Sequence, residues 1–254
     1  MEEKTETKAD ADNLTKLRVD ADQNRKSPAL KPRLAATLIL LDHSGPVTKV
    51  LMGRRHADHK FMPGKFVFPG GRTEPFDRLM SVAGALPPVV EEKLKKRVVK
   101  LSASRPKTLA LAALRETFEE TGILIGSRGF AGAAPALAEP WAAFVAHGVW
   151  PSLENLTFIA RAITPPGRPR RFDAHFFATD AKDIVHQVEG VVTSTSELVE
   201  LVWIPLPEAR QLDLPPITHV VLNELDKRIE AGMGHDLPVP FYYERNKRWN
   251  REEL

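Results

Sequence analysis

The sequence predicts an α/β or α+β domain built around a mixed β-sheet. Strand-like apolar runs and amphipathic helical runs are interspersed along the chain rather than grouped. Two pairs of strand-like runs are separated by short Gly- and Pro-containing turns, which is typical of hairpins. With 254 residues, 43% of them hydrophobic, the chain can form one large domain or one domain with additions.

The first predicted hairpin joins "RLAATLILLD" (33–42), a buried strand, to "VTKVLMGRR" (47–55), its antiparallel partner, across "HSGP". Residues 64–72, "GKFVFPGGR", predict a short strand that runs into a Gly-Gly loop. Further strands are expected at 156–164 and 171–179, which form a second hairpin across "PPGRPR", and at 198–206.

Three segments predict helices outside the sheet. Residues 207–212 begin a short helix, and 217–232 form a long amphipathic one. Residues 87–101 predict another amphipathic helix, whose apolar side holds the residues Val90, Leu94, Val98 and Leu101. A packed surface helix is the favoured interpretation of this segment, and a substrate lid or a partner surface is the alternative. Residues 1–31 are polar and predict a disordered or loosely attached tail.

Composition excludes several classes of function. The absence of cysteine excludes disulfides, Cys-ligated zinc and thiol catalysis. No apolar run reaches the roughly 18 residues that a membrane-spanning helix needs. The net charge of +3 is too small to argue for nucleic acid. We therefore expect a cytoplasmic protein that binds neither membranes nor nucleic acid.

The stretch "LRETFEETG" (114–122) places Glu116, Glu119 and Glu120 on one side of a predicted helix. Its opposite side is apolar, and Gly122 is a natural helix end. Such a cluster is either a solvated acidic face or a site for a hard divalent cation, which takes oxygen ligands.

The Gly-Gly pair, Gly70 and Gly71, followed later by R-E-x-x-E-E-x-G, resembles the signature box of Nudix hydrolases. The matching residues of the second part are Arg115, Glu116, Glu119, Glu120 and Gly122. The resemblance implies a Nudix-like α/β/α sandwich with a mixed sheet over residues 32–254. Within it, 78–107 would be a helical insertion inside the box, and 233–254 a C-terminal extension.

This insertion separates Gly71 from Arg115 and shifts the place of one further box glutamate. Counted from the front of the box that place falls on Asp77, and counted from the rear it falls on Lys107. A box interrupted in this way resembles the peroxisomal coenzyme A diphosphatase branch of the family. The upstream segment "VLMGRRHADHKFMPGKFVFPGG" partly resembles that branch's signature, with Arg55 and Lys60 in place to bind substrate phosphates.

The family likeness implies hydrolysis of a pyrophosphate bond in a nucleoside diphosphate derivative, with Mg²⁺ or Mn²⁺ as cofactor. The implied metal ligands are Glu116, Glu119, Glu120 and the carbonyl of Gly70, with Arg115 orienting Glu119. Gly71 and the two basic residues are the implied substrate contacts. The general base is either Glu120 or a late glutamate, for which Glu197 is the first candidate and Glu189 and Glu200 are its competitors.

Coenzyme A or acyl-coenzyme A, giving 3′,5′-ADP and (acyl)phosphopantetheine, is the first substrate expected. NADH and ADP-ribose are alternatives that use the same residues. A non-catalytic Nudix-fold module that binds a nucleotide is the competing class, although such modules usually lose the box carboxylates that this chain keeps. Beside the favoured packed surface helix, the insertion at 78–107 leaves two further roles open, covering the site or forming a homodimer interface.

Overall fold

The computed structural model of the chain describes residues 30–99, 102–130, 132 and 139–254. The predicted tail at 1–31 therefore lies almost wholly outside the described residues. The strands of the described part are β1 (Arg33–Asp42), β2 (Lys49–Arg55), β3 (Phe66–Val67), β4 (Gly70–Arg72), β5 (Ile123–Ile125), β6 (Thr157–Ile163), β7 (Phe172–Asp180), β8 (Ile184–Gln187), β9 (Leu198–Pro205), β10 (Pro240–Arg245) and β11 (Arg248–Glu253). The helices are α2 (Pro88–Lys95), α3 (Arg105–Thr121), α4 (Glu139–Ala146), α5 (Leu206–Ala209) and α6 (Pro216–Glu230), with short 3₁₀ turns η1 (Asp77–Leu79) and η2 (Ala181–Asp183).

Within the described residues the main sheet has nine strands and is mixed, as the sequence predicts. Its order is β11-β10-β6-β7-β1-β2-β3, with β4 also paired to β1 and β9 to β2. The two predicted hairpins are confirmed, since β1 pairs antiparallel with β2 and β6 antiparallel with β7. The pairs β1–β7 and β6–β10 are parallel, and β5 and β8 form a separate small sheet.

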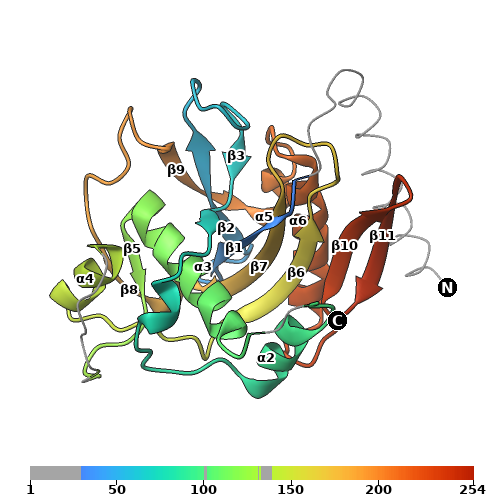
Figure 1. Ribbon diagram of the computed structural model, residues 1–254. Coiled ribbons are helices and arrows are strands. Elements are labelled where there is room, and N and C mark those ends of the chain that lie inside the picture. The colour runs from blue at the N-terminus through green and yellow to red at the C-terminus, as the bar shows by residue number, and fades with distance from the viewer. Residues whose placement is uncertain (1–29, 100–101, 131, 133–138) are drawn as a thin grey trace.

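Strand β1 is buried on both faces and divides the interior into two cores. Leu38 and Leu40 belong to the core under α3, whereas Ile39 and Leu41 belong to the core under α6. Successive side chains of a strand point to opposite faces, so a continuous apolar run suits a strand covered by helices on both sides. The result is the expected α/β/α sandwich, with α3 and α6 on opposite faces of the sheet (Figure 1).

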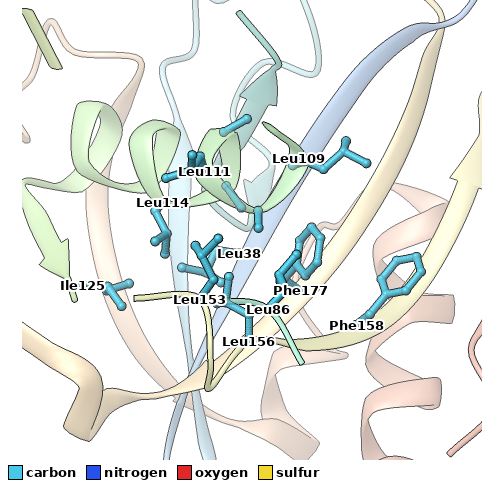
Figure 2. Packing of buried hydrophobic residues seen from close by; sticks show 14 of the residues in the cluster. Leu38, Leu86, Leu109, Leu111, Leu114, Ile125, Leu153, Leu156, Phe158 and Phe177 are labelled. Atoms are coloured by element: carbon cyan, nitrogen blue, oxygen red, sulfur yellow. The ribbon is translucent and has the colours of Figure 1, made fainter. Parts of the chain in front are cut away.

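The middle of helix α3 is covered on all sides, since the six consecutive residues from Leu109 to Leu114 are fully buried. Leu114 points toward Leu38 of the sheet (Figure 2). The helix ends at Gly122, which adopts the left-handed conformation at φ 74° and donates its N–H to the Phe118 carbonyl. The packing and the fixed helix end together hold the acidic side of α3 at a constant distance from the sheet.

Two sequence-based expectations on elements require correction. The Gly-Gly pair is part of strand β4, where Gly70 and Gly71 pair with Thr37 and Ala36 of β1, rather than a loop. The helix expected over 87–101 ends at Lys95. The tertiary reason is Arg161, a buried guanidinium whose Nη1 donates to the Lys96 carbonyl at 3.1 Å, an acceptor that a continued helix would use internally.

Helix α2 packs into the core through Val90 and Leu94 and is anchored by a buried lysine. The Lys93 ammonium donates to the carbonyls of His235 and Leu237, both at 2.6 Å, in the segment that follows α6. Within this segment's continuation, β10 and β11 form a hairpin that turns at Asn246 and Lys247, both with positive φ. Tyr242 of β10 is completely buried, so this C-terminal hairpin is packed on the rest of the domain.

No helix in the described part of the chain is both long and apolar enough to cross a membrane.

We predict that Lys93→Met lowers the free energy of unfolding by about 1–3 kcal/mol, because the partly buried carbonyls of His235 and Leu237 lose the hydrogen bonds that the buried ammonium donates. Urea denaturation measures this change. The control is Lys95→Met in the same helix, whose ion pairs with Glu91 and Glu92 are largely exposed and should contribute less than about 1 kcal/mol. Equal losses in the two variants would contradict the anchoring role of Lys93.

Candidate active site on helix α3

The candidate site is organised by a single buried guanidinium. Arg115 projects from α3 toward the sheet, and its side chain is only 3% exposed. Its Nε donates to Asp77 at 2.7 Å, and its Nη2 donates to the Arg72 carbonyl at 2.7 Å. Its Nη1 donates to Glu116 at 2.9 Å and to Glu119 at 2.6 Å. The guanidinium therefore joins the acidic helix to the end of β4 and to η1.

Asp77 belongs to the contacts of Arg115, and the sequence pointed to it only by position. It is fully buried, accepts two hydrogen bonds from Arg115, and also accepts the Glu74 N–H at 2.8 Å. Counting from the front of the box placed Asp77 where a loop-fixing glutamate usually stands, and this is the position that contacts Arg115. Lys107, the position reached by counting from the rear, lies instead in the first turn of α3.

Glycine at position 71 is required by the close approach of Glu116. A Cβ atom at Gly71 would lie 2.4 Å from the Glu116 carboxyl carbon, which no real contact allows. The neighbouring Gly70 donates its backbone N–H to Glu120 Oε2 at 3.0 Å. Strand β4 thus presents bare backbone to two of the three predicted carboxylates.

Burial and mutual repulsion make these carboxylates difficult to ionise. Burial raises the pKa of Glu116 to about 7, against the opposing effect of Arg115. Burial also raises the pKa of Glu120 well above its usual range, and the negative charge of Glu197 adds to this shift. Burial raises the pKa of Glu119 as well, and the opposing effect of Arg115 is smaller. A cation near these groups would favour their charged forms.

The donor set fits a hard divalent cation, which prefers carboxylate and carbonyl oxygens. Buried carboxylates of raised pKa, held against glycine backbone, are the arrangement that such an ion would stabilise. The types of ligand atom suit such an ion, but they do not surround a single ion position. In the described part of the chain, no three acidic or histidine side chains converge on one point. Glu116 and Glu119 are directed instead toward Arg115.

A second acidic group reaches this region from the segment between β8 and β9. Glu197 lies near enough to Glu120 for its charge to affect the Glu120 carboxyl, and so does Arg55 at the end of β2. Arg55 Nη2 donates to Glu197 Oε1 at 2.5 Å. A cavity of about 480 Å³ adjoins this pair, and its lining residues are His56, Asp58, His59, Thr195, Ser196 and Glu197.

The remaining candidates from the sequence lie apart from these contacts. Lys60 is exposed and takes part in none of the contacts described for the site. Glu200 pairs with Arg54 at 2.7 Å, and Glu189 lines a different cavity, of about 310 Å³, near the end of α3. His59 was not singled out by any sequence pattern, because only the fold of the 56–65 loop brings it to Arg55 and Glu197.

We predict that Gly71→Ala weakens Mn²⁺ binding by about tenfold or more, because the added Cβ displaces the Glu116 carboxylate. The melting temperature should change little, since the displaced group is the end of a flexible side chain. Isothermal titration calorimetry with Mn²⁺ and thermal unfolding measure the two effects. Gly45→Ala is the matched control, because a Cβ there meets open space; unchanged Mn²⁺ affinity in Gly71→Ala would contradict the assignment.

Comparison with known proteins supports the fold. No family model matches the sequence, and no curated protein matches it. Among solved structures, a Nudix hydrolase from Alicyclobacillus acidocaldarius is 28% identical, with a TM-score of 0.55. The alignment covers 76% of this chain and 90% of that protein.

Two weaker likenesses were also found. The NUDIX domain of Shewanella oneidensis NrtR, complexed with ADP ribose, is 12% identical with a TM-score of 0.43, over 84% of this chain and 97% of that one. The MutT protein from Methanosarcina mazei Go1 is 15% identical with a TM-score of 0.44, over 80% and 99%. Both are too distant to support an argument about this chain. The likeness to the Alicyclobacillus protein and the observed α/β/α architecture together show that the chain has a Nudix-like fold.

Proposed function

We propose that this protein is a metal-dependent diphosphatase that hydrolyses the pyrophosphate bond of a nucleoside diphosphate derivative. The observation that carries the proposal is the group of Glu116, Glu119 and Glu120, in which Glu120 is buried, Glu116 is partly buried and Glu119 is exposed. Arg115 binds Glu116 and Glu119, and the glycine backbone of β4 contacts Glu116 and Glu120. A solvated acidic face would have no need of a buried arginine or of bare backbone against its carboxylates. The similarity to a Nudix hydrolase supports the same class of reaction.

The reaction adds water across a phosphoanhydride. The water oxygen forms a bond to one phosphorus, and the bond from that phosphorus to the bridging oxygen breaks. The leaving phosphate keeps the electron pair, and the proton of the water passes to a carboxylate of the protein. Bound Mg²⁺ or Mn²⁺ would supply positive charge beside the two phosphoryl groups.

Different residues of the chain would bind the metal, orient its ligands and accept the proton. Glu116, Glu119, Glu120 and the Gly70 carbonyl are the proposed metal ligands. Arg115 orients Glu119 through the 2.6 Å hydrogen bond, which fixes one ligand relative to the helix. Glu120 and Glu197 are the two candidates for the carboxylate that accepts the water's proton, since their charges interact and both lie on this side of the sheet.

Coenzyme A or acyl-coenzyme A is the substrate we propose first, on the resemblance of the 50–71 segment to that branch of the family. Arg55, Lys60 and Gly71 are the proposed substrate contacts, with the two basic residues toward the phosphates. The open surface hollow beside Glu197 supports a second candidate, ADP-ribose or NADH, because its lining side chains include hydroxyl, imidazole and carboxylate groups that can bind sugar hydroxyls.

A substrate panel tests both candidates. Purified protein is incubated with Mg²⁺ or Mn²⁺ and coenzyme A, acyl-coenzyme A, NADH, ADP-ribose or capped RNA, and products are identified by mass spectrometry. Release of 3′,5′-ADP with phosphopantetheine would support the coenzyme A assignment. AMP from NADH or ADP-ribose alone would keep the reaction and replace the substrate. Binding without turnover of any compound would favour a nucleotide-binding module.

We predict that Glu120→Gln lowers kcat at least about 100-fold on whichever panel compound the wild type hydrolyses, while the nucleotide still binds. The reason is that the amide can neither accept a proton nor carry the charge that a divalent cation requires. Steady-state kinetics and calorimetry with the same compound separate the two effects. The control is Glu92→Gln on the exposed side of α2. Wild-type kcat in Glu120→Gln would contradict the proposed site.

A further inference from the structure

We propose that His59 is a positioning residue that, together with Arg55, holds Glu197 in place as the carboxylate that accepts the proton of the attacking water. This proposal rests on the function proposed above and assigns a role to a residue outside the acidic helix. It also assigns a role to the contact between two loops, 56–65 after β2 and 188–197 before β9. These loops are far apart in the sequence and leave the same end of the antiparallel pair formed by β2 and β9.

The contacts converge on one carboxylate oxygen. Arg55 Nη2 lies 2.5 Å from Glu197 Oε1, and His59 Nε2 lies 3.6 Å from the same oxygen. The same Arg55 nitrogen lies 2.9 Å from His59 Nε2. The three side chains therefore form one compact group, which we call the Glu197 clamp.

His59 is itself fixed by the backbone of its loop. Its Nδ1 lies 3.1 Å from the Phe61 N–H and 2.8 Å from the Phe61 carbonyl, so this nitrogen has a backbone partner in either tautomer. The His59 N–H in turn donates to the His56 carbonyl at 3.0 Å. Arg55 Nη2 contacts both ring nitrogens, at 3.0 Å from Nδ1 and 2.9 Å from Nε2. Nε2 also faces Glu197 Oε1 at 3.6 Å, which is a charge contact rather than a hydrogen bond.

The clamp joins the two loops through the backbone as well. The His56 N–H donates to the Glu197 carbonyl at 3.0 Å, next to the side-chain contacts. The pairing of β2 with β9 shifts register here, from Arg54 opposite Glu200 to Arg55 opposite Leu198. Such irregularities commonly re-aim a side chain at the edge of a site.

The clamp leaves its carboxylate accessible. The side chain of Arg55 is 11% exposed and that of His59 is 23% exposed, whereas that of Glu197 is 47% exposed. Two mostly buried residues thus hold an accessible third at the wall of the 480 Å³ cavity. An unrestrained glutamate on a loop would sample many rotamers, and confining it in advance removes that entropic cost from the reaction.

A neighbouring ion pair on the same two strands, between Arg54 and Glu200, serves as a comparison because it has none of the features of the Glu197 clamp. Arg54 and Glu200 pair at 2.7 Å, and both side chains are nearly half exposed. No histidine joins them in the described structure, and neither lines the cavity beside Glu197. Arg54 is therefore a matched control for the clamp.

The decisive experiment is a double-mutant cycle between His59→Gln and Glu197→Gln, with coenzyme A and ADP-ribose as probes and Mn²⁺ as the metal. We expect His59→Gln to lower kcat about 10- to 100-fold with KM little changed, because the base is misplaced while substrate contacts remain. In the Glu197→Gln background the same substitution should have no further effect. His59→Ala is measured alongside, and Arg54→Gln should leave kcat unchanged.

Two outcomes would overturn the proposal. One is that the losses of the two substitutions multiply in the double variant, since residues acting through one another are not additive. The other is a loss in Arg54→Gln as large as that in His59→Gln, which would indicate a general effect on the strands.

A readout independent of turnover separates this proposal from the proposed function. Hydrogen–deuterium exchange of residues 188–197 should accelerate in His59→Gln and stay unchanged in Arg54→Gln. If the wild type hydrolyses neither probe, the proposed function fails on these substrates, and exchange alone decides whether the clamp exists. Unchanged exchange at 188–197 in both His59 variants would overturn the clamp whatever the activity.

Discussion

The interaction on which the site depends is the burial of the Arg115 guanidinium. A buried charge is costly unless its donors are satisfied, and the five hydrogen bonds of Arg115 go to Asp77, the Arg72 carbonyl, Glu116 and Glu119. Burial by itself would lower the pKa of Arg115, but the hydrogen bond that Arg115 donates to Asp77 and the charge of Glu116 outweigh it and raise that pKa. The helix, the end of β4 and the 3₁₀ turn η1 must therefore meet at this point.

The contacts of Arg115 also position the acidic side of α3. Arg115 offsets the repulsion among neighbouring carboxylates, which would otherwise disfavour the helix. Gly71 leaves room for the close approach of the Glu116 carboxylate, whereas Gly70 leaves room for the close approach of Ala36 and Thr37 of β1. The core under α3 then fixes the distance between the sheet and the carboxylates of Glu116, Glu119 and Glu120, since Leu111 and Leu114 are fully buried in that core.

The part of the chain between Gly71 and Arg115 contributes to the site at one end and to the rest of the fold at the other. Asp77 completes the coordination of Arg115, whereas Lys93 binds carbonyls in the segment that follows α6. Helix α2, which carries Lys93, packs against the core of the sandwich. Its packing agrees with the favoured interpretation of a surface helix joined to the domain, rather than a separate lid.

The sequence by itself determined the class of fold, the hairpins, the end of α3 at Gly122 and the grouping of Glu116, Glu119 and Glu120, because period, turn residues and helical spacing are local properties. Only the tertiary structure decided that α2 ends at Lys95, that the glycine pair lies in a strand, and that Asp77 rather than Lys107 is close to Arg115. It alone also brought His59 and Arg55 to Glu197, since two loops separated by more than a hundred residues meet only when β2 pairs with β9. Such contacts depend on strand pairing and on the satisfaction of buried polar groups, neither of which has a local pattern in the chain.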